Sequence, residues 1–305
     1  MFAGANRVGR QLFAALPSPF LANGEVDGQT MTRFAGLVNR SSADGAFVAG
    51  TTGEFLALEQ TERRALVVAA LQGLGDKRLV VHIGAPSVRQ CVALARDAAD
   101  VGVTEMALMT PLFLPTGADA VVRFFDEVAR GLAHGVRLYA YLFRVRTNVE
   151  VSPGTLRRIA SVAPLVGVKV SGESLETCVA YKEALGAEFE VFTGTDGDYG
   201  RAGVAGLHGV VSGVASCLPE VFDGLNRALG SGDGAAVAAA QTAVRDAVGV
   251  MNGGDIARIK ATLRLRGMGT GRVRMPMDEV SEAVRAELAG VVERAAVGGS
   301  GAGTE

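Results

Sequence analysis

The 305-residue chain has little of what marks a disulfide-bonded or metal-binding protein. It contains three cysteines, Cys91, Cys178 and Cys217, which lie far apart and form no Cys-x-x-Cys pair. This spacing argues against a disulfide framework and a zinc site, and it fits a reducing compartment. The three histidines are scattered too, so their spacing indicates no histidine-based metal site. We therefore expect no bound metal.

The chain also lacks an excess of charge of one sign and a long apolar run. Lysine and arginine number 30 against 32 aspartates and glutamates, which gives a formal net charge of -2. This balance gives no reason to expect nucleic-acid binding. No run is long and apolar enough to span a membrane, and the first residues lack the basic-then-apolar order of a signal peptide. We expect a soluble, cytoplasmic protein that binds neither nucleic acid nor membranes.

What the chain does have is a regular alternation of apolar runs and amphipathic stretches. Eight apolar runs predict strands: residues 11–16, 45–49, 79–83, 105–109, 136–141, 165–170, 190–193 and 209–212. Helix-like segments follow them at residues 30–40, 59–73, 88–100, 118–133, 153–163, 175–185, 198–205 and 218–229. Strand–helix units that repeat at a spacing of roughly 30 residues predict an α/β fold, the (β/α)8 TIM barrel.

A doubly wound open sheet shares this alternation and is the main competing fold. The number of units and the absence of a Gly-x-Gly-x-x-Gly turn after the first strand favour the barrel. Beyond the eighth unit, residues 235–250, 256–267 and 278–296 predict helices with no strands between them. We therefore predict a catalytic barrel domain over 1–230, a C-terminal helical extension over 231–297 and a glycine-rich disordered tail over 298–305.

The sixth predicted strand contains a lysine. Side chains alternate across a strand, so Lys169 shares a face with Gly167 and Ser171, which are small. Burying an unpaired ammonium group is costly, and burial lowers the pKa of a lysine toward the neutral, nucleophilic amine. Such an amine can form a Schiff base with a carbonyl substrate. The alternative is a lysine whose stem packs while its head reaches water.

Other polar residues follow the predicted strands, where the active sites of barrels are built. The sequence Gly-Thr-Thr-Gly-Glu at 50–54 follows the second strand and offers backbone N–H groups and hydroxyls that could hold a small carboxylate. Its alternative is an ordinary glycine-rich loop with Glu54 near a helix start. Tyr141 ends the fifth strand and could transfer protons, and Arg144 and Arg146 beyond it could bind a carboxylate. Their alternatives are a packed ring and surface charges.

Taken together, these residues resemble the family of pyruvate-dependent class I aldolases typified by dihydrodipicolinate synthase and N-acetylneuraminate lyase. The similarity covers residues 12–276. Four matches in this order carry it: Gly-Thr-Thr-Gly-Glu at 50–54, Tyr141 followed by Arg146-Thr147, Gly-Val-Lys-Val-Ser-Gly at 167–172, and His-Gly-Val-Val-Ser at 208–212.

The resemblance implies a set of catalytic roles. Lys169 would condense with the keto group of pyruvate, and Tyr141 would shuttle protons to and from the carbinolamine. Thr52, with Gly53 beside it, would hold the pyruvate carboxylate, and Thr51 would belong to the proton relay. The covalent lysine–pyruvate imine would then need no metal and no dissociable cofactor.

The resemblance also assigns the rest of the pocket and shows where this chain departs from the synthase. Val211 would line the pyruvate pocket, and Arg146 matches the position that holds the second substrate's carboxylate. The synthase has two consecutive tyrosines where this chain has Leu112 and Phe113. Phenylalanine cannot pass a proton, so the relay is altered. Arg144 stands in a changed loop and, with Arg146, indicates an anionic substrate.

We therefore expect a Schiff-base lyase or aldolase that forms or cleaves a C–C bond between pyruvate, or another 2-keto acid, and an aldehyde. Two alternatives depart from a true 4-hydroxy-tetrahydrodipicolinate synthase. One is an aldolase or dehydratase of 2-keto-3-deoxy sugar acids, and the other is a non-catalytic keto-acid-binding paralogue. A barrel enzyme of metal- or phosphate-dependent mechanism is disfavoured, because the strand ends offer no clear set of metal ligands. Relatives of this kind are commonly oligomers, so we expect a homodimer or homotetramer.

Overall fold

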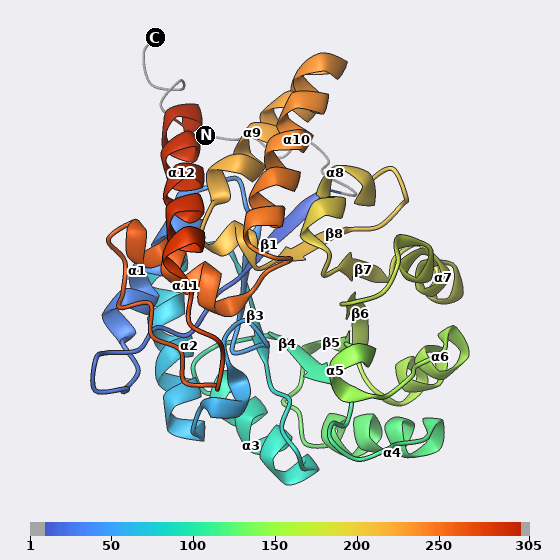
Figure 1. The fold of residues 1–305 in the computed structure, drawn as a ribbon. Helices are drawn as coiled ribbons and strands as arrows, with labels where there is room; N and C mark the ends of the chain where they lie inside the picture. The colour runs from blue at the N-terminus through green and yellow to red at the C-terminus, as the bar shows by residue number, and fades with distance from the viewer. Residues whose placement is uncertain (1–9, 300–305) are drawn as a thin grey trace. The chain divides into compact units, whose positions relative to one another are not determined.

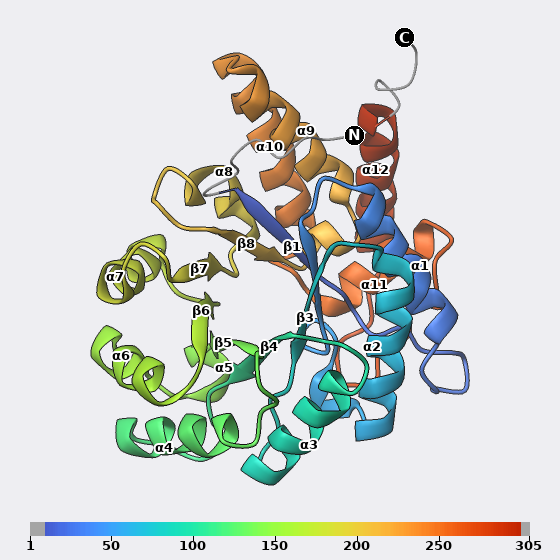
Figure 2. The same cartoon turned by 180° about the vertical axis from the view of Figure 1, so that it is seen from behind.

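The structure, a computed structural model, describes residues 10–299. Within this range eight parallel strands form a closed barrel in the order β1 to β8, and helices alternate with them along the chain (Figures 1 and 2). The predicted (β/α)8 barrel is thereby confirmed. The strands are β1 (Gln11–Ala15), β2 (Gly45–Val48), β3 (Arg78–His82), β4 (Glu105–Met109), β5 (Arg137–Leu142), β6 (Leu165–Val170), β7 (Glu190–Thr193) and β8 (Gly209–Ser212).

The helices of the first four strand–helix units are α1 (Gly28–Arg40), α2 (Gln60–Leu74), α3 (Val88–Ala99) and α4 (Ala118–Ala129). Those that follow are α5 (Arg144–Thr147), α6 (Pro153–Val162), α7 (Leu175–Leu185), α8 (Tyr199–Ala202) and α9 (Pro219–Ser231). The C-terminal helices are α10 (Gly234–Val250), α11 (Ile256–Leu265) and α12 (Glu282–Gly299).

The predicted strands agree with the observed ones to within a residue at each end. Three helices differ more, and one of them, predicted over 118–133, ends at Ala129. The helix expected over 198–205 is reduced to α8, because the three glycines at 200, 203 and 206 disfavour a longer helix and Gly206 has a positive φ of 76°. The helix expected over 278–296 begins at Glu282, after Ser281, whose hydroxyl accepts a hydrogen bond from the N–H of Val284.

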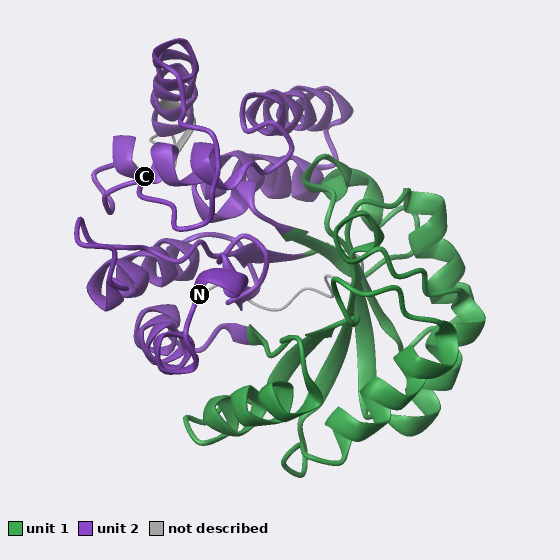
Figure 3. Ribbon diagram, turned by 60° about the horizontal axis from the view of Figure 1, so that its bottom comes forward, with its two compact units in different colours: residues 1–11, 80–211 green, residues 12–79, 212–305 purple. Residues whose placement is uncertain are grey.

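The chain forms two compact units, each built from two segments (Figure 3). The described part of unit 1 comprises residues 10–11 and 80–211, and that of unit 2 comprises residues 12–79 and 212–299. The division predicted at residue 230 stays a prediction. Of the tail predicted over 298–305, residues 298 and 299 end α12 and the others lie outside the described residues. No helix in the described range has the length and apolarity needed to cross a membrane.

Unit 1 places its helices in sequence along its strands. α3 packs on α4, α4 on α6 and α6 on α7. Three of these helices begin with a serine whose hydroxyl accepts from a backbone N–H three residues later: Ser87 for α3, Ser152 for α6 and Ser174 for α7. Such caps satisfy backbone donors that have no partner inside the helix, so the sequence itself sets where these helices start.

Unit 2 contains the helices at both ends of the chain. α1 packs on α2, and α12 packs on α9, α10 and α11. Aspartates replace serine as the caps here: Asp27 for α1, Asp233 for α10 and Asp255 for α11. Both groups of helices bury apolar side chains, among them Met31 and Phe34 on α1 and Leu288 on α12.

An ion pair joins α2 to the segment between α11 and α12. The guanidinium of Arg274 donates to both carboxylate oxygens of Glu62, at 2.7 and 2.6 Å, and both side chains are about one-fifth exposed. This hydrogen bonding is the chief reason that the pKa of Glu62 lies below its ordinary value. A bidentate arginine–carboxylate pair is among the stronger charge-assisted contacts.

Replacing Glu62 by glutamine should lower the free energy of unfolding at neutral pH by about 1 kcal/mol. A folded pKa below the unfolded value of 4.5 gives stabilisation that is present above pH 4.5 and is lost as the pH falls through the folded pKa. Urea unfolding of both proteins across this range measures the effect. The gap between them should close on acidification, and a gap of constant size would contradict this account.

Candidate active site

Strand β6 places Lys169 in the interior of unit 1. The side chain is 7% exposed, and in register it lies beside Tyr141 on β5 and Phe192 on β7. Its neighbour on the same face, Gly167, has no room for a side chain, because an added Cβ would lie 2.4 Å from the carbonyl oxygen of Glu190. The prediction of a buried lysine with a small neighbour on its strand is therefore confirmed.

Tyr141 forms one wall around the amine. It is 1% exposed, and the Nζ atom of Lys169 lies 4.2 Å from the centroid of its ring. Adjacent parallel strands place register partners on the same face, which is why residues 28 positions apart in the sequence meet here. The structure thus brings together the two residues to which the sequence assigned the amine and the proton transfer.

Two further rings hold Tyr141 in place. His82, the last residue of β3, meets it edge-on at 5.8 Å between centroids and is 1% exposed. Phe143 stacks on it at 6.2 Å with an angle of 26° between the planes. An added Cβ at Gly84 would come within 2.4 Å of His82 Nε2, so Gly84 leaves the space that the imidazole occupies. His82 was given no role from the sequence, although its place at a strand end was the available signal.

The two candidate arginines lie on α5, a single helical turn that the sequence did not predict. The side chain of Arg144 is more than half exposed, and its Nη2 atom lies 3.5 Å from Oε2 of Glu150. Arg146 is exposed, and its guanidinium carbon lies 5.9 Å from the ring centroid of Phe143. The turn ends at Asn148, whose left-handed backbone lets its N–H bond to the carbonyl oxygen of Arg144 at 2.8 Å. Both arginines are therefore open to an external ligand.

Phe113 stands out on the loop after β4. Its side chain is 90% exposed and its φ is 77°, a value that non-glycine residues rarely adopt. Leu114 beside it is 66% exposed. An aromatic ring held in a strained, exposed position costs free energy unless another surface covers it.

The turn at residues 50–54 belongs to unit 2 and is tightly constrained. The N–H of Glu54 donates to the carbonyl oxygen of Thr51 at 3.0 Å, and Ser18 Oγ donates to that of Gly53 at 2.6 Å. Ala49 and Glu54, on either side, both have positive φ. Gly53 leaves little room for a side chain, because an added Cβ would lie 3.1 Å from the Cα of Ala49.

Two threonines of this turn carry hydroxyl groups. Thr51 and Thr52 are half-buried, and Thr52 Oγ1 lies near Gly213 just after β8, 3.7 Å from where a Cβ would stand. Hydroxyls and backbone N–H groups in such a turn suit a small anion. Val211, on β8, is 5% exposed and belongs to unit 1. The roles of these residues in binding stay predictions.

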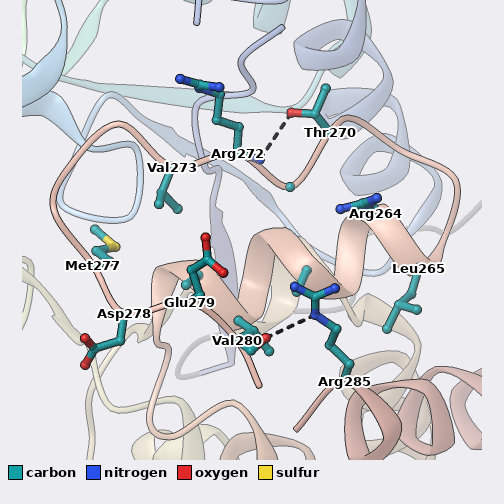
Figure 4. Close-up of a pocket in the computed structure, with 13 residues that line it drawn as sticks. Arg264, Leu265, Thr270, Arg272, Val273, Met277, Asp278, Glu279, Val280 and Arg285 are labelled. Atoms are coloured by element: carbon teal, nitrogen blue, oxygen red, sulfur yellow. Dashed lines mark hydrogen bonds between the residues drawn. The ribbon is translucent and has the colours of Figure 1, made fainter. Parts of the chain in front are cut away.

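A cavity of about 790 Å³ lies elsewhere in unit 2 and is shown in Figure 4. Its walls are α11 and the segment 270–280, and Arg264, Arg272, Asp278 and Glu279 on them are exposed. Its lining includes no lysine, so it offers no amine for an imine. Among residues 10–299 no group of three or more metal-binding side chains is close enough to hold an ion.

Known proteins match this chain over most of its length. The model of the dihydrodipicolinate synthetase family matches residues 9–295. An uncharacterized DapA-like lyase of Halobacterium salinarum is 32% identical over 271 residues, which cover 88% of this chain and 88% of that protein. N-acetylneuraminate lyase of Danio rerio is 32% identical over 234 residues, which cover 73% of this chain and 74% of that protein.

A solved structure agrees with these matches at the level of the fold. YagE, a prophage protein of the dihydrodipicolinic acid synthase family from E. coli K12 crystallised with pyruvate, superposes with a TM-score of 0.85 at 20% identity. The superposition covers 94% of this chain and 98% of YagE. On the family match and the similarity of the relatives, the chain belongs to the dihydrodipicolinate synthetase family of pyruvate-dependent lyases.

Proposed function

We propose that this protein is a Schiff-base lyase or aldolase in which Lys169 condenses with the keto group of pyruvate. The observation that carries the proposal is the buried Nζ of Lys169, 4.2 Å from the ring of the buried Tyr141. A second buried lysine, Lys260, belongs to unit 2, where it pairs with the carboxylate of Glu54.

The chemistry follows from the amine. Nζ adds to C2 of pyruvate to give a carbinolamine, and loss of water leaves an iminium group that draws electrons from the neighbouring methyl carbon. Loss of a methyl proton then gives an enamine, which attacks the carbonyl carbon of an aldehyde. Hydrolysis of the imine releases the product, and the reverse sequence cleaves it. Tyr141, beside the amine, would carry the protons that these steps gain and lose.

The pyruvate carboxylate is assigned to the turn after β2. Thr52 and Gly53 would hold it through the Thr52 hydroxyl and backbone N–H groups, with Thr51 in the proton relay and Val211 lining the pocket. The half-buried hydroxyls and the rigidity of the turn support this assignment. A covalent imine of this kind needs no dissociable cofactor.

The second substrate is proposed to be an anionic aldehyde or its aldol product, such as a 2-keto-3-deoxy sugar acid. The exposed arginines of α5, Arg144 and Arg146, would meet its carboxylate. Phe113 in place of a relay tyrosine disfavours the lysine-pathway synthase reaction. A non-catalytic keto-acid-binding protein is the second candidate, and turnover of a panel of aldehydes and 2-keto-3-deoxy acids distinguishes the two.

We also propose that the protein is a homodimer or homotetramer in the cytoplasm. The exposed ring of Phe113, with Leu114 beside it, supports a contact with a second copy of the chain. Such a contact would cover a strained aromatic residue that is otherwise in water. The cytoplasmic location rests on the sequence alone.

Borohydride reduction in the presence of pyruvate tests the function directly. Reduction should lock the imine as a stable secondary amine on the peptide that contains Lys169, because only an imine is trapped in this way. The four lysines of the chain, Lys77, Lys169, Lys182 and Lys260, are separable by peptide mass mapping. Lys169→Ala should lose the adduct and Lys182→Ala should keep it. An adduct on Lys260, or none on the wild type, would refute the proposal.

Replacing Tyr141 by phenylalanine keeps the ring and removes the hydroxyl. If Tyr141 transfers protons, turnover should fall about 10²- to 10⁴-fold while the pyruvate concentration for half-maximal trapping changes far less. Tyr139→Phe on the same strand is the matched control, because its hydroxyl bonds to Glu190 instead. Equal loss of turnover and pyruvate binding in Tyr141→Phe would assign it a binding role.

A further inference from the structure

Glu54 ends the Thr51–Thr52–Gly53 turn as a fully buried carboxylate. Its Oε2 accepts hydrogen bonds from the backbone N–H groups of Arg274, at 2.7 Å, and Met275, at 2.8 Å. Its Oε1 accepts one from Lys260 Nζ. Glu54 itself has a left-handed backbone with φ of 52°, an unfavourable conformation for glutamate that these contacts hold in place.

Lys260 reaches this carboxylate from α11. It is 3% exposed, and its Nζ also donates to the carbonyl oxygen of Arg272 at 2.9 Å. The centroid of the Phe20 ring lies 4.1 Å from Nζ of Lys260 and 4.3 Å from the guanidinium carbon of Arg274. Burial lowers the pKa of Lys260 to about 8, although Glu54 works against this shift. The pair is therefore costly to bury.

The cost of burying the Glu54–Lys260 pair indicates that its role is something other than stabilising the fold. A buried ion pair is often no more stabilising than well-packed apolar residues of the same size, whereas removal of one partner leaves an uncompensated charge. What the pair does achieve is a fixed backbone. The segment 272–275 is fastened on one side to Glu54, and on the other Arg274 donates to the carbonyl oxygens of Gly24 and Ala57. Arg272 and Val273 of this segment also line the cavity of Figure 4.

We propose that Glu54 and Lys260 are positioning residues that set the orientation of the Thr51–Thr52–Gly53 turn for the carboxylate of the keto-acid substrate. Ser18 holds the carbonyl of Gly53, and the Glu54–Lys260 pair holds the residue that follows it. The C-terminal segment and α11 thereby take part in substrate binding without touching the substrate. This inference rests on the proposed function for the identity of the ligand.

Three variants and a matched control test the inference. Glu54→Gln and Lys260→Met each break the pair, and the double variant removes both charges. Arg266→Met is the control, because Arg266 pairs with Glu220 and thus joins the end of α11 to α9, away from the turn. The readouts are the pyruvate concentration for half-maximal borohydride trapping, the amount trapped at saturation, the thermal midpoint and the amide exchange of a peptide that covers residues 50–55.

Both single variants should raise the half-maximal pyruvate concentration about tenfold, because a small misplacement of a binding group has large effects. The amount trapped at saturating pyruvate should change little, since Lys169 is untouched. Exchange at residues 50–55 should become faster. The double variant should lie closer to the wild type than Lys260→Met does, because glutamine can accept from both backbone N–H groups and no buried charge is left alone.

A merely structural role predicts a different pattern. In that case Glu54→Gln and Lys260→Met would lose stability as Arg266→Met does, with half-maximal pyruvate within about twofold of the wild type. That result would overturn the inference. If the wild type traps no pyruvate, the proposed function fails, and the positioning role is decided by exchange alone. Unchanged exchange at residues 50–55 in both single variants would then refute it.

Discussion

The contact between the buried amine of Lys169 and the ring of Tyr141 is the constraint on which the interior of unit 1 depends. An amine buried inside a barrel loses its hydration, so its burial is tolerated only where neighbouring groups interact with it favourably. The register of β5 and β6 supplies the ring of Tyr141, and Gly167 keeps the neighbouring position on the strand empty. His82 and Phe143 then limit the movement of that ring. The amine of Lys169 is thus held beside the ring of Tyr141, the arrangement on which the proposed chemistry depends.

Short-range patterns in the sequence were enough to predict most of the strands and helices. The strands follow from apolar, β-branched runs, and several helices begin at serine or aspartate caps. The candidate catalytic residues were predicted at the strand ends because parallel strands of a barrel end on the same side. Of these residues, Lys169 and Tyr141 lie together in the structure. The predictions that failed concern local structure. Glycines limit α8 to a single turn, and α5 forms where only a loop was expected.

Long-range contacts were beyond sequence reasoning. Glu54 and Lys260 are 206 positions apart, and neither position carries a pattern that points to the other. Glu54 looked like a residue near a helix start, yet its carboxylate is buried and holds the backbone of the segment after α11. The C-terminal helices belong to unit 2. Helix periodicity predicted that these helices have apolar faces, but it does not reveal what those faces contact.

The chemistry proposed at Lys169 fits the family to which the chain belongs. The proposal for the second substrate depends on the exposed arginines of α5 and on the exposed phenylalanine after β4. The central claim, however, is the covalent bond at Lys169, and a crystal structure of the protein soaked in pyruvate tests it most directly. The account predicts continuous density from Lys169 Nζ to C2 of pyruvate. Pyruvate bound without that bond, or joined to another lysine, would contradict it.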